Sequence, residues 1–399
     1  MGSRRFDVVI FGATGFTGKF VAQHVAQFAP LGARIGIAGR DVEKLKGVAA
    51  TLALPVQLVR ADSGDPASLA ALAAESIAIA TTVGPYRKYG LPLVEACARA
   101  GTHLCDINGE VLYMREAIDR FDAAAKASGA RIVTSCGFDS IPSDLGMWTL
   151  AHAANEPLAE AALVVDSMRG GFSGGTIASF SSTLDAARED RAARKILLDP
   201  YSLSPDRAAE PDLGPQRDGH TIRKDALAGG WTAPFIMESI NSRVVRRSNA
   251  LLGHAWGKRL RYREVFLLKT RPLAFARGAA LPLAFAGIAR ARRFGVARRL
   301  LDKVLPPPGT GPDEPARLSG NFKLRLLGLT ESGRKVAVRV FGDGDPGYAA
   351  TARMLGEAVM ALAFDGDALP SRAGLLTPST GLGAALVARL RPQRVTFDV

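Results

Sequence analysis

The sequence predicts an α/β protein with a Rossmann-type doubly wound parallel sheet, followed by a second α+β domain with a mostly antiparallel sheet. A strand, a glycine-rich turn and a helix start follow one another at Phe6–Gly18, and six short apolar strands alternate with helices up to residue 150. Beyond that point the pattern changes, and Asn321–Phe341 reads as a hairpin. We therefore expect domains at 1–150 and 151–399.

The stretch FDVVIFGATGFTG at Phe6–Gly18 combines a buried strand with a glycine turn. Three glycines follow the strand in the order G-x-x-G-x-x-G, ahead of a helix expected over Lys19–Phe28. Without Cβ atoms the backbone can turn tightly and approach a pyrophosphate, whose charge then faces the helix N-terminus. We predict that this stretch binds a dinucleotide, with a structural glycine turn as the alternative. The predicted contact residues are Gly12, Thr14, Gly15, Phe16, Thr17 and Gly18.

The end of the second strand, Ala33–Ala38, predicts which dinucleotide binds. An acid at this position binds the ribose of NAD, whereas arginine accommodates the 2′-phosphate of NADP. This chain has Arg40 there, so we predict NADP(H), the alternative being a solvated arginine at a helix start. The third strand, Val56–Arg60, is followed by Asp62, which we place near the adenine.

Candidates for the reacting centre follow the fourth, fifth and sixth strands, expected at Ile77–Thr82, His103–Cys105 and Arg131–Ser135. They are the loops Tyr86–Gly90, Asp106–Glu110 and Gly137–Asp144. Parallel α/β sheets bind ligands at the carboxyl ends of their strands, so Gly84 and Pro85 join the predicted cofactor site.

The catalytic candidates in these loops are Tyr86 and Asp139. A phenol can donate a proton, and the neighbouring Arg87 or Lys88 would lower the pKa of Tyr86. The alternatives are that Tyr86 packs the loop or stacks on the cofactor, and that Asp139 caps the helix after Pro142.

The second domain is expected to contain strands, a loop-rich stretch and helices in mixed order. The expected elements are strands at Ala162–Arg169, Ile236–Arg246, Leu260–Lys269, Asn321–Leu329 and Lys335–Phe341, a loop-rich stretch at Tyr201–Gly230, and helices near Ile177–Leu198, at Tyr348–Ala363 and at Leu382–Leu390. We expect a C-terminal helix to return to the first domain.

The sequence lacks the motifs that several classes of protein require. Cys97, Cys105 and Cys136 form no C-x-x-C pair, and no H-E-x-x-H motif exists, so we expect neither disulfides nor a metal site. No tyrosine has lysine four residues later, which excludes the short-chain dehydrogenases. The G-x-S-x-G at Gly171–Gly175 lacks the context of a hydrolase.

The net charge of +13 comes from one segment. Residues 243–303 hold 16 basic and 2 acidic side chains, whereas residues 1–150 hold 15 and 14. The apolar stretch Pro272–Ala289 lies beside a cluster of arginines. We expect this segment to meet an anionic membrane or an acidic carrier protein, the alternative being a core helix with a solvated basic end. We expect no nucleic-acid partner.

Blocks along the chain resemble the saccharopine-dehydrogenase-like family. They are GATGFTGKF, AGR at 38–40, TTVGPYRKYGLPLVEACARAGTHLCDINGE and CGFDSIPSDLG. Within that family, VRRSNALL, PPPGTGP and GLLTPSTGLG resemble the trans-acting enoyl reductases of polyketide-lipid assembly. The resemblance implies an NADP-binding Rossmann domain and reduction of a carbon–carbon double bond on a long acyl chain. Its implied partner is a polyketide synthase or an acyl carrier protein.

This interpretation has two rivals, which are saccharopine-type imine reduction and a non-catalytic NADP-binding protein associated with lipid. We expect a cytoplasmic protein, peripheral at the inner face of the plasma membrane, because no signal peptide or transmembrane span is recognisable. A homodimer is a further expectation.

The assignment of Arg40 to the 2′-phosphate can be tested by titration with both cofactors. A charge-assisted hydrogen bond contributes roughly 1.5–3 kcal/mol, which corresponds to about 10- to 150-fold in affinity. Arg40→Ala should therefore weaken NADPH binding by that order and leave NADH binding nearly unchanged. Equal losses for the two cofactors would contradict the assignment.

Overall fold

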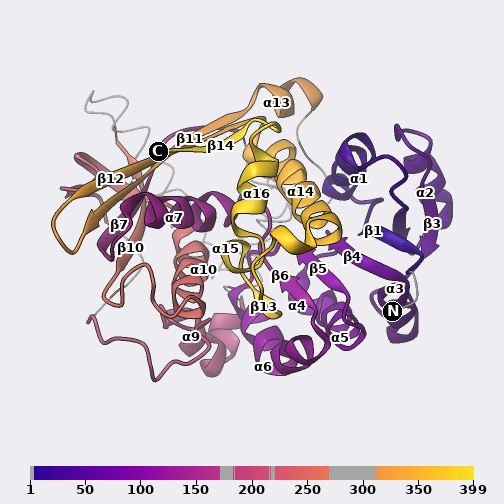
Figure 1. Cartoon of the computed structure of the whole chain (residues 1–399), viewed down its shortest axis with the longest axis horizontal. Coiled ribbons are helices and arrows are strands. Elements are labelled where there is room, and N and C mark those ends of the chain that lie inside the picture. Colours follow the sequence, from indigo (N-terminus) through magenta and orange to yellow (C-terminus); the bar gives the residue numbers. More distant parts are fainter. Residues whose placement is uncertain are drawn as a thin grey trace, which may run out of the picture. The chain divides into compact units, whose positions relative to one another are not determined.

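The chain forms two compact units (Figure 1). The computed structural model describes residues 4–170, 185–214, 221–268 and 313–399, together with 183, 216 and 311. The first unit comprises Met1–Ile141 and Gly347–Val395, and the second comprises Pro142–Pro346 and Thr396–Val399. The division therefore falls at the start of helix α7 (Ile141–Ala154) and not at residue 150.

The first unit is built on a parallel sheet whose order, in the described residues, is β13-β6-β5-β4-β1-β2-β3. The bounds are β1 Phe6–Phe11, β2 Ile35–Gly39, β3 Gln57–Arg60, β4 Ser76–Thr81, β5 His103–Asp106, β6 Arg131–Val133 and β13 Gly374–Leu376. Central strand β1 is almost wholly buried, as its apolar run predicts. The six expected strands are confirmed, and β13 adds an edge strand from the C-terminal segment.

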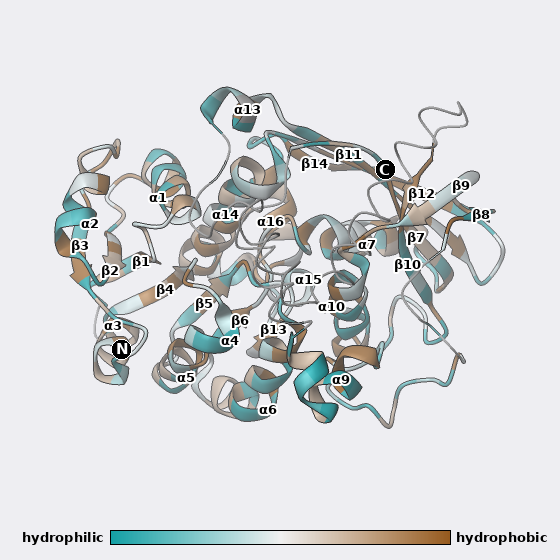
Figure 2. Cartoon of the chain, turned by 180° about the vertical axis from the view of Figure 1, so that it is seen from behind, coloured by the Kyte–Doolittle hydropathy of each residue, from teal (hydrophilic) through white to brown (hydrophobic). Residues whose placement is uncertain are grey.

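Helices cover both faces of this sheet. Helices α1 and α14 pack together on one face with α16, while α3, α5 and α6 form a row on the other (Figure 1). The outer turns of α2 and α6 carry hydrophilic residues (Figure 2). The bounds are α1 Phe16–Phe28, α2 Val42–Ala49, α3 Pro66–Glu75, α4 Tyr86–Tyr89, α5 Leu91–Ala100, α6 Val111–Ser128, η1 Pro346–Ala350, α14 Thr351–Phe364, η2 Gly366–Ala368, α15 Pro378–Gly381 and α16 Gly383–Leu390.

A buried polar contact fastens the C-terminal segment to α1. The His24 imidazole Nε2 lies 2.9 Å from Glu357 Oε1, and Arg389 Nη1 lies 3.2 Å from the other oxygen of that carboxylate. Gly356 gives His24 room, because a Cβ there would meet the imidazole ring at 2.5 Å. Breaking a buried pair of this kind leaves a polar group without its partner, so the contact specifies how α14 lies against α1.

The second unit contains a mixed sheet, ordered β14-β12-β11-β7-β10-β9-β8 in the described residues. Apart from the parallel pair β7–β10, the register is antiparallel wherever it is defined, and β11 and β12 form the expected hairpin. Helix α7 packs closely on one face, since a Cβ on Gly146 would meet the side chain of Leu326. The bounds are β7 Leu158–Arg169, β8 Arg223–Asp225, β9 Gly230–Pro234, β10 Arg261–Leu267, β11 Asn321–Thr330, β12 Lys335–Asp343 and β14 Val395–Asp398.

The expected strand at Ile236–Arg246 is wrong, because this stretch begins helix α10 (Glu238–Leu251). The alternation of apolar and polar residues suggested a strand, but the polar side chains are themselves buried. Arg243 and Arg247 donate to the carbonyls of Leu197 and Leu203, and Asn241 donates to Glu264 at 2.9 Å. Hydrogen bonds to neighbouring segments therefore override the hydropathy pattern on which the prediction rested.

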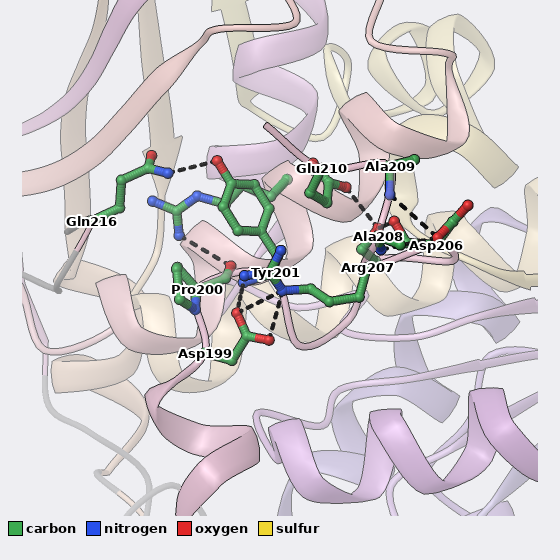
Figure 3. Close-up of polar contacts among 11 residues, drawn as sticks. Asp199, Pro200, Tyr201, Asp206, Arg207, Ala208, Ala209, Glu210 and Gln216 are labelled. Atoms are coloured by element: carbon green, nitrogen blue, oxygen red, sulfur yellow. Dashed lines mark hydrogen bonds and ion pairs between the residues drawn. The ribbon is translucent and has the colours of Figure 1, made fainter. Parts of the chain in front are cut away.

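Polar and aromatic contacts connect described residues of the loop-rich stretch that begins at Tyr201 (Figure 3). Arg207 and Arg246 lie against the Tyr201 ring, 5.1 and 5.5 Å from its centre, and Gln216 donates to its hydroxyl at 2.5 Å. Arg207 also pairs with Asp199 at 2.9 Å. Cation–π and charge-assisted contacts thus hold a segment that has little regular secondary structure.

The basic segment 243–303 is only partly described. Its first three arginines, Arg243, Arg246 and Arg247, are buried in the second unit, so they do not contribute to a basic surface. The apolar stretch Pro272–Ala289 and the arginines after it lie outside the described residues. Within the described ranges, no helix combines the length and the apolar character that crossing a bilayer requires.

Two short helices border the segments that are not described. They are α9 Arg191–Leu198 and α13 Glu314–Ser319. Most of the helix expected near Ile177–Leu198, and the glycines of Gly171–Gly175, lie outside the described residues.

Candidate functional site

The turn after β1 brings the predicted phosphate-binding residues to the carboxyl edge of the parallel sheet. The Gly12 amide donates to the Ala38 carbonyl at 2.9 Å, and the Gly15 amide donates to the Gly12 carbonyl at 2.9 Å. Helix α1 then begins at Phe16 without a side-chain cap. The amides of its first turn therefore keep their capacity for an anion, and the helix dipole adds positive potential there.

The three glycines of this turn differ in backbone conformation and in how closely other atoms approach them. Gly12 has φ +90°, which favours glycine, and Gly18 packs so closely on the Gly12 carbonyl that a Cβ would collide with it. A Cβ on Gly15 would meet only the Gly12 oxygen, at 3.2 Å. This one contact is tight, and within the described residues no other atom lies within 4 Å of that Cβ position. The space beside Gly15 fits the close approach of a pyrophosphate.

Arg40 lies at the same edge, directly after β2, which pairs with β1. Its side chain is exposed, and Thr14 approaches the end of β2, with its hydroxyl oxygen 3.9 Å from where a Gly39 Cβ would lie. Asp41, the acid next to Arg40, accepts the Lys44 amide at 3.1 Å and caps α2. Thr14, Gly15 and Arg40 thus follow neighbouring strands at the same edge of the sheet, and their contacts with NADP stay predictions.

Asp62 follows β3, the outermost strand beside β2. One of its carboxylate oxygens accepts the Gly64 amide at 2.9 Å, and its backbone amide donates to Ser68 Oγ at 3.1 Å. The side chain therefore shapes the turn before α3, and its predicted contact with the adenine stays a prediction.

A second group of polar residues gathers where β4 and β5 end. The Glu110 carboxylate accepts the amides of Tyr86 and Arg87 at 3.0 and 2.9 Å, so it caps the short helix α4 that follows Gly84 and Pro85. The Tyr86 hydroxyl donates to the Thr81 carbonyl at 3.1 Å and accepts the Ile107 amide at 3.4 Å. These contacts fix the loop after β4 at the place where we predict cofactor contact.

Asp106 connects the ends of β5 and β6. Its carboxylate accepts the amides of Ser135 and Asn108 at 2.9 and 3.1 Å, the Asn108 side chain at 2.6 Å and the Tyr113 hydroxyl at 3.2 Å. Burial raises the pKa of Asp106, while these donors oppose the rise by stabilising the carboxylate. Asp106 is thus a structural acid.

The expectation that Arg87 or Lys88 lowers the pKa of Tyr86 is wrong. Burial, and then the negative charge of Asp106, raise the pKa of Tyr86 well above its ordinary value. The side chains of Arg87 and Lys88 are exposed, and Tyr86 is buried. The phenol keeps its proton more firmly than a free tyrosine, and its hydroxyl already bonds to two backbone groups. Its predicted part in catalysis stays untested.

Asp139 differs from these residues because its carboxyl makes no hydrogen bond or ion pair within the described part of the chain. It lies in the tight turn after β6, where the Gly137 carbonyl accepts the amides of Ser140 and Ile141 at 3.3 and 2.9 Å. The loss of hydration raises the pKa of Asp139 to about 7. A carboxyl group that is partly protonated near neutral pH can act as a general acid.

Comparison with known proteins gives the family. Residues 8–133 match the saccharopine dehydrogenase NADP-binding domain. A Mycobacterium tuberculosis protein assigned to the trans-acting enoyl reductases is 46% identical over 99% of this chain and 97% of its own length. The trans-acting enoyl reductase of Mycobacterium ulcerans is 42% identical over 97% and 96%. The chain belongs to the trans-acting enoyl reductase family.

A solved structure with the same fold is apo saccharopine dehydrogenase from Saccharomyces cerevisiae. It is 12% identical, covers 98% of each chain and has a TM-score of 0.53, so it supports the fold alone. The matched domain confirms NADP(H) as the cofactor of this family member, an NADP-dependent oxidoreductase. The residues assigned to individual cofactor contacts remain predictions.

The open space beside Gly15 predicts that Gly15→Val abolishes binding of NADPH and NADH alike. The valine side chain would fill the volume that the pyrophosphate needs, while the fold keeps its packing. Gly47→Val is the control, because a Cβ at Gly47, in helix α2, has no neighbour within 4 Å. Fluorescence titration of the folded variants measures both, and tight NADPH binding by Gly15→Val would refute the assignment.

The raised pKa of Asp139 predicts an effect on stability that requires no substrate. Ionising the carboxyl is harder in the folded chain than in the unfolded chain, so this group makes the protein less stable as pH rises from about 4 to about 7. Asp139→Asn should therefore raise Tm at pH 8 and change it little near pH 4. The control is Asp367→Asn, at an exposed acid, which should show no such pH dependence.

Proposed function

We propose that this chain uses NADPH to reduce the carbon–carbon double bond of a long enoyl chain, held as a thioester on a polyketide synthase or an acyl carrier protein. The observation that carries the proposal is the similarity to trans-acting enoyl reductases over 97–99% of the chain. The open turn at Gly15, with Arg40 beside it, supports the cofactor part. The acyl partner comes from the resemblance and from the relatives' names.

Bound NADPH supplies a hydride equivalent to the β-carbon of the substrate. The chain's own residues must then stabilise the negative charge on the thioester oxygen and deliver a proton to the α-carbon. Tyr86 and Asp139 both follow strands at the carboxyl edge of the sheet, where α/β enzymes bind their ligands.

Of these two candidates, Asp139 has the properties of the proton donor. The Tyr86 hydroxyl is held by the Thr81 carbonyl and the Ile107 amide, and its pKa is raised. The Asp139 carboxyl makes no hydrogen bond within the described residues, and its pKa of about 7 lets it hold a proton at neutral pH and release it. We assign proton delivery to Asp139 and support of the loop to Tyr86.

The apolar stretch Pro272–Ala289 precedes a cluster of arginines in the sequence, a pattern that suits attachment to anionic lipid. We propose an anionic membrane surface as a second partner, at the inner face of the plasma membrane.

A stopped-flow assay of NADPH absorbance tests the proposal. Mixing the enzyme and NADPH with an enoyl thioester should consume NADPH, whereas an amino acid paired with a keto acid, which forms an imine, should not. Consumption only with the imine-forming pair would instead support saccharopine-type chemistry. No consumption with either, despite tight NADPH binding, would favour the non-catalytic alternative.

The same assay separates the two candidate acids. Asp139→Asn should lower kcat by about 10²-fold or more at unchanged NADPH affinity, because a positioned general acid contributes at least that much. Parent kcat should fall as pH rises through about 7, since the acid must be protonated to act. Tyr86→Phe should keep kcat within a few-fold. The reverse pattern would return the role of proton donor to Tyr86.

A further inference from the structure

The carboxyl of Asp139 has no hydrogen-bond partner within the described residues, so the position of this acid depends on the backbone around it. That backbone is a tight turn, closed by hydrogen bonds from Ser140 and Ile141 to the Gly137 carbonyl at 3.3 and 2.9 Å. A turn of this kind can move as a unit unless a neighbouring element holds it. The contacts that the turn makes with distant parts of the chain therefore help to set the position of the Asp139 carboxyl.

One such contact comes from the C-terminal segment. The Phe138 amide, next to Asp139, donates to Thr351 Oγ1 at 3.0 Å across 213 positions of sequence. Thr351 is the first residue of α14, and only 6% of its surface is exposed. Its methyl group is equally close to the turn, because a Cβ on Gly137 would lie 3.1 Å from Thr351 Cγ2. Both branches of one side chain thus engage the residues that precede the acid.

The same segment reaches the start of the NADP-binding helix. Tyr348, in the π-helical turn η1 before Thr351, packs edge-on against Phe16, with ring centres 4.7 Å apart. Phe16 is the first residue of α1, directly after Gly15. Residues Tyr348–Thr351 therefore contact both the turn that carries the proposed proton donor and the helix start that faces the cofactor phosphates. Turns of π-helix occur frequently at functional sites.

We propose that Thr351 is a positioning residue for Asp139, holding the turn after β6 so that the carboxyl of Asp139 meets the α-carbon of the substrate. This inference rests on the proposed function and assigns a role to a residue that lies far from every sequence motif of the site. The Thr351 hydroxyl is needed because the Phe138 amide is buried and requires a hydrogen-bond acceptor. A β-branched residue suits position 351 because its methyl group fills the space over Gly137.

Thr351→Val tests this role, because it keeps the shape and removes the acceptor. We expect kcat with an enoyl thioester to fall by about 10-fold or more, as for small misplacements of a catalytic group, with the NADPH dissociation constant unchanged. Thr351→Ser keeps the acceptor and should stay within roughly 3-fold of the parent enzyme. Thr149→Val in α7 is the matched control, because the Thr149 hydroxyl donates only within its own helix, to Leu145 at 2.9 Å.

Two further readouts distinguish positioning from general stability. In Thr351→Val the solvent deuterium isotope effect on kcat should rise, because proton delivery becomes slower than the other steps. The pH at which kcat declines should also move, because a displaced turn changes the surroundings of Asp139. Tyr86 interacts electrostatically with Asp139, and this interaction would change when the turn moves. A purely structural role would leave both readouts at the parent values.

The outcomes are separable. Equal losses in Thr351→Val and Thr351→Ser, or parent values of kcat and isotope effect in Thr351→Val, would overturn the role of the hydroxyl. If Thr351→Val does not fold, Gly137→Ala replaces it. The added Cβ would lie 3.1 Å from Thr351 Cγ2 and 3.2 Å from Ile107 Cγ2, so it should displace the turn from Thr351 with a similar loss of kcat. Parent turnover in Gly137→Ala would overturn the proposal. A parent enzyme inactive toward enoyl thioesters would overturn the proposed function itself.

Discussion

The buried carboxylate of Asp106 is the interaction on which the candidate site depends. It collects hydrogen bonds from the end of β6, from the loop after β5 and from α6, so that three segments keep fixed positions around one acid. Ser135 adopts φ +62°, an uncommon conformation for a residue with a side chain, and its amide bond to Asp106 helps to hold it there. The turn that carries Asp139 begins two residues later. The position of Asp139, the proposed acid, therefore depends on Asp106, which takes no part in the proposed chemistry.

Polar residues at the sheet edge fall into two physical classes. The carboxylates of Asp106 and Glu110 accept hydrogen bonds from backbone amides, and the Tyr86 hydroxyl bonds to a carbonyl and an amide. All three side chains therefore stabilise the loops around them. Asp139 keeps its carboxyl free of such bonds within the described residues. A carboxyl group that loses hydration without gaining a hydrogen bond costs stability. Groups whose pKa is shifted at the expense of stability are found most often at functional sites.

The sequence predicted most local features of the fold and missed several contacts between residues that are distant in the chain. The strands of the parallel sheet and the turn at Gly12–Gly18 were readable because buried strands and phosphate-binding turns need particular residue types within a short window. The position of Arg40, directly after β2, was readable for the same reason. Helix α10 was not, because its arginines are buried through partners in the 197–203 segment that hydropathy cannot reveal. Thr351 was not, because its partner Phe138 lies 213 positions away.

The return of residues Gly347–Val395 to the first unit has a consequence for how the protein is made. The cofactor-binding unit is interrupted in the sequence by nearly all of the second unit. During synthesis β1 emerges first, but α14, which covers β1, β4 and β5, emerges only near the end, together with edge strand β13. Until then, in the described part of the chain, α1 alone covers its part of that face, and the apolar residues of the sheet that α14 later buries lack that helix. The unit that begins to form first on the ribosome is therefore completed only after the second unit has almost entirely emerged.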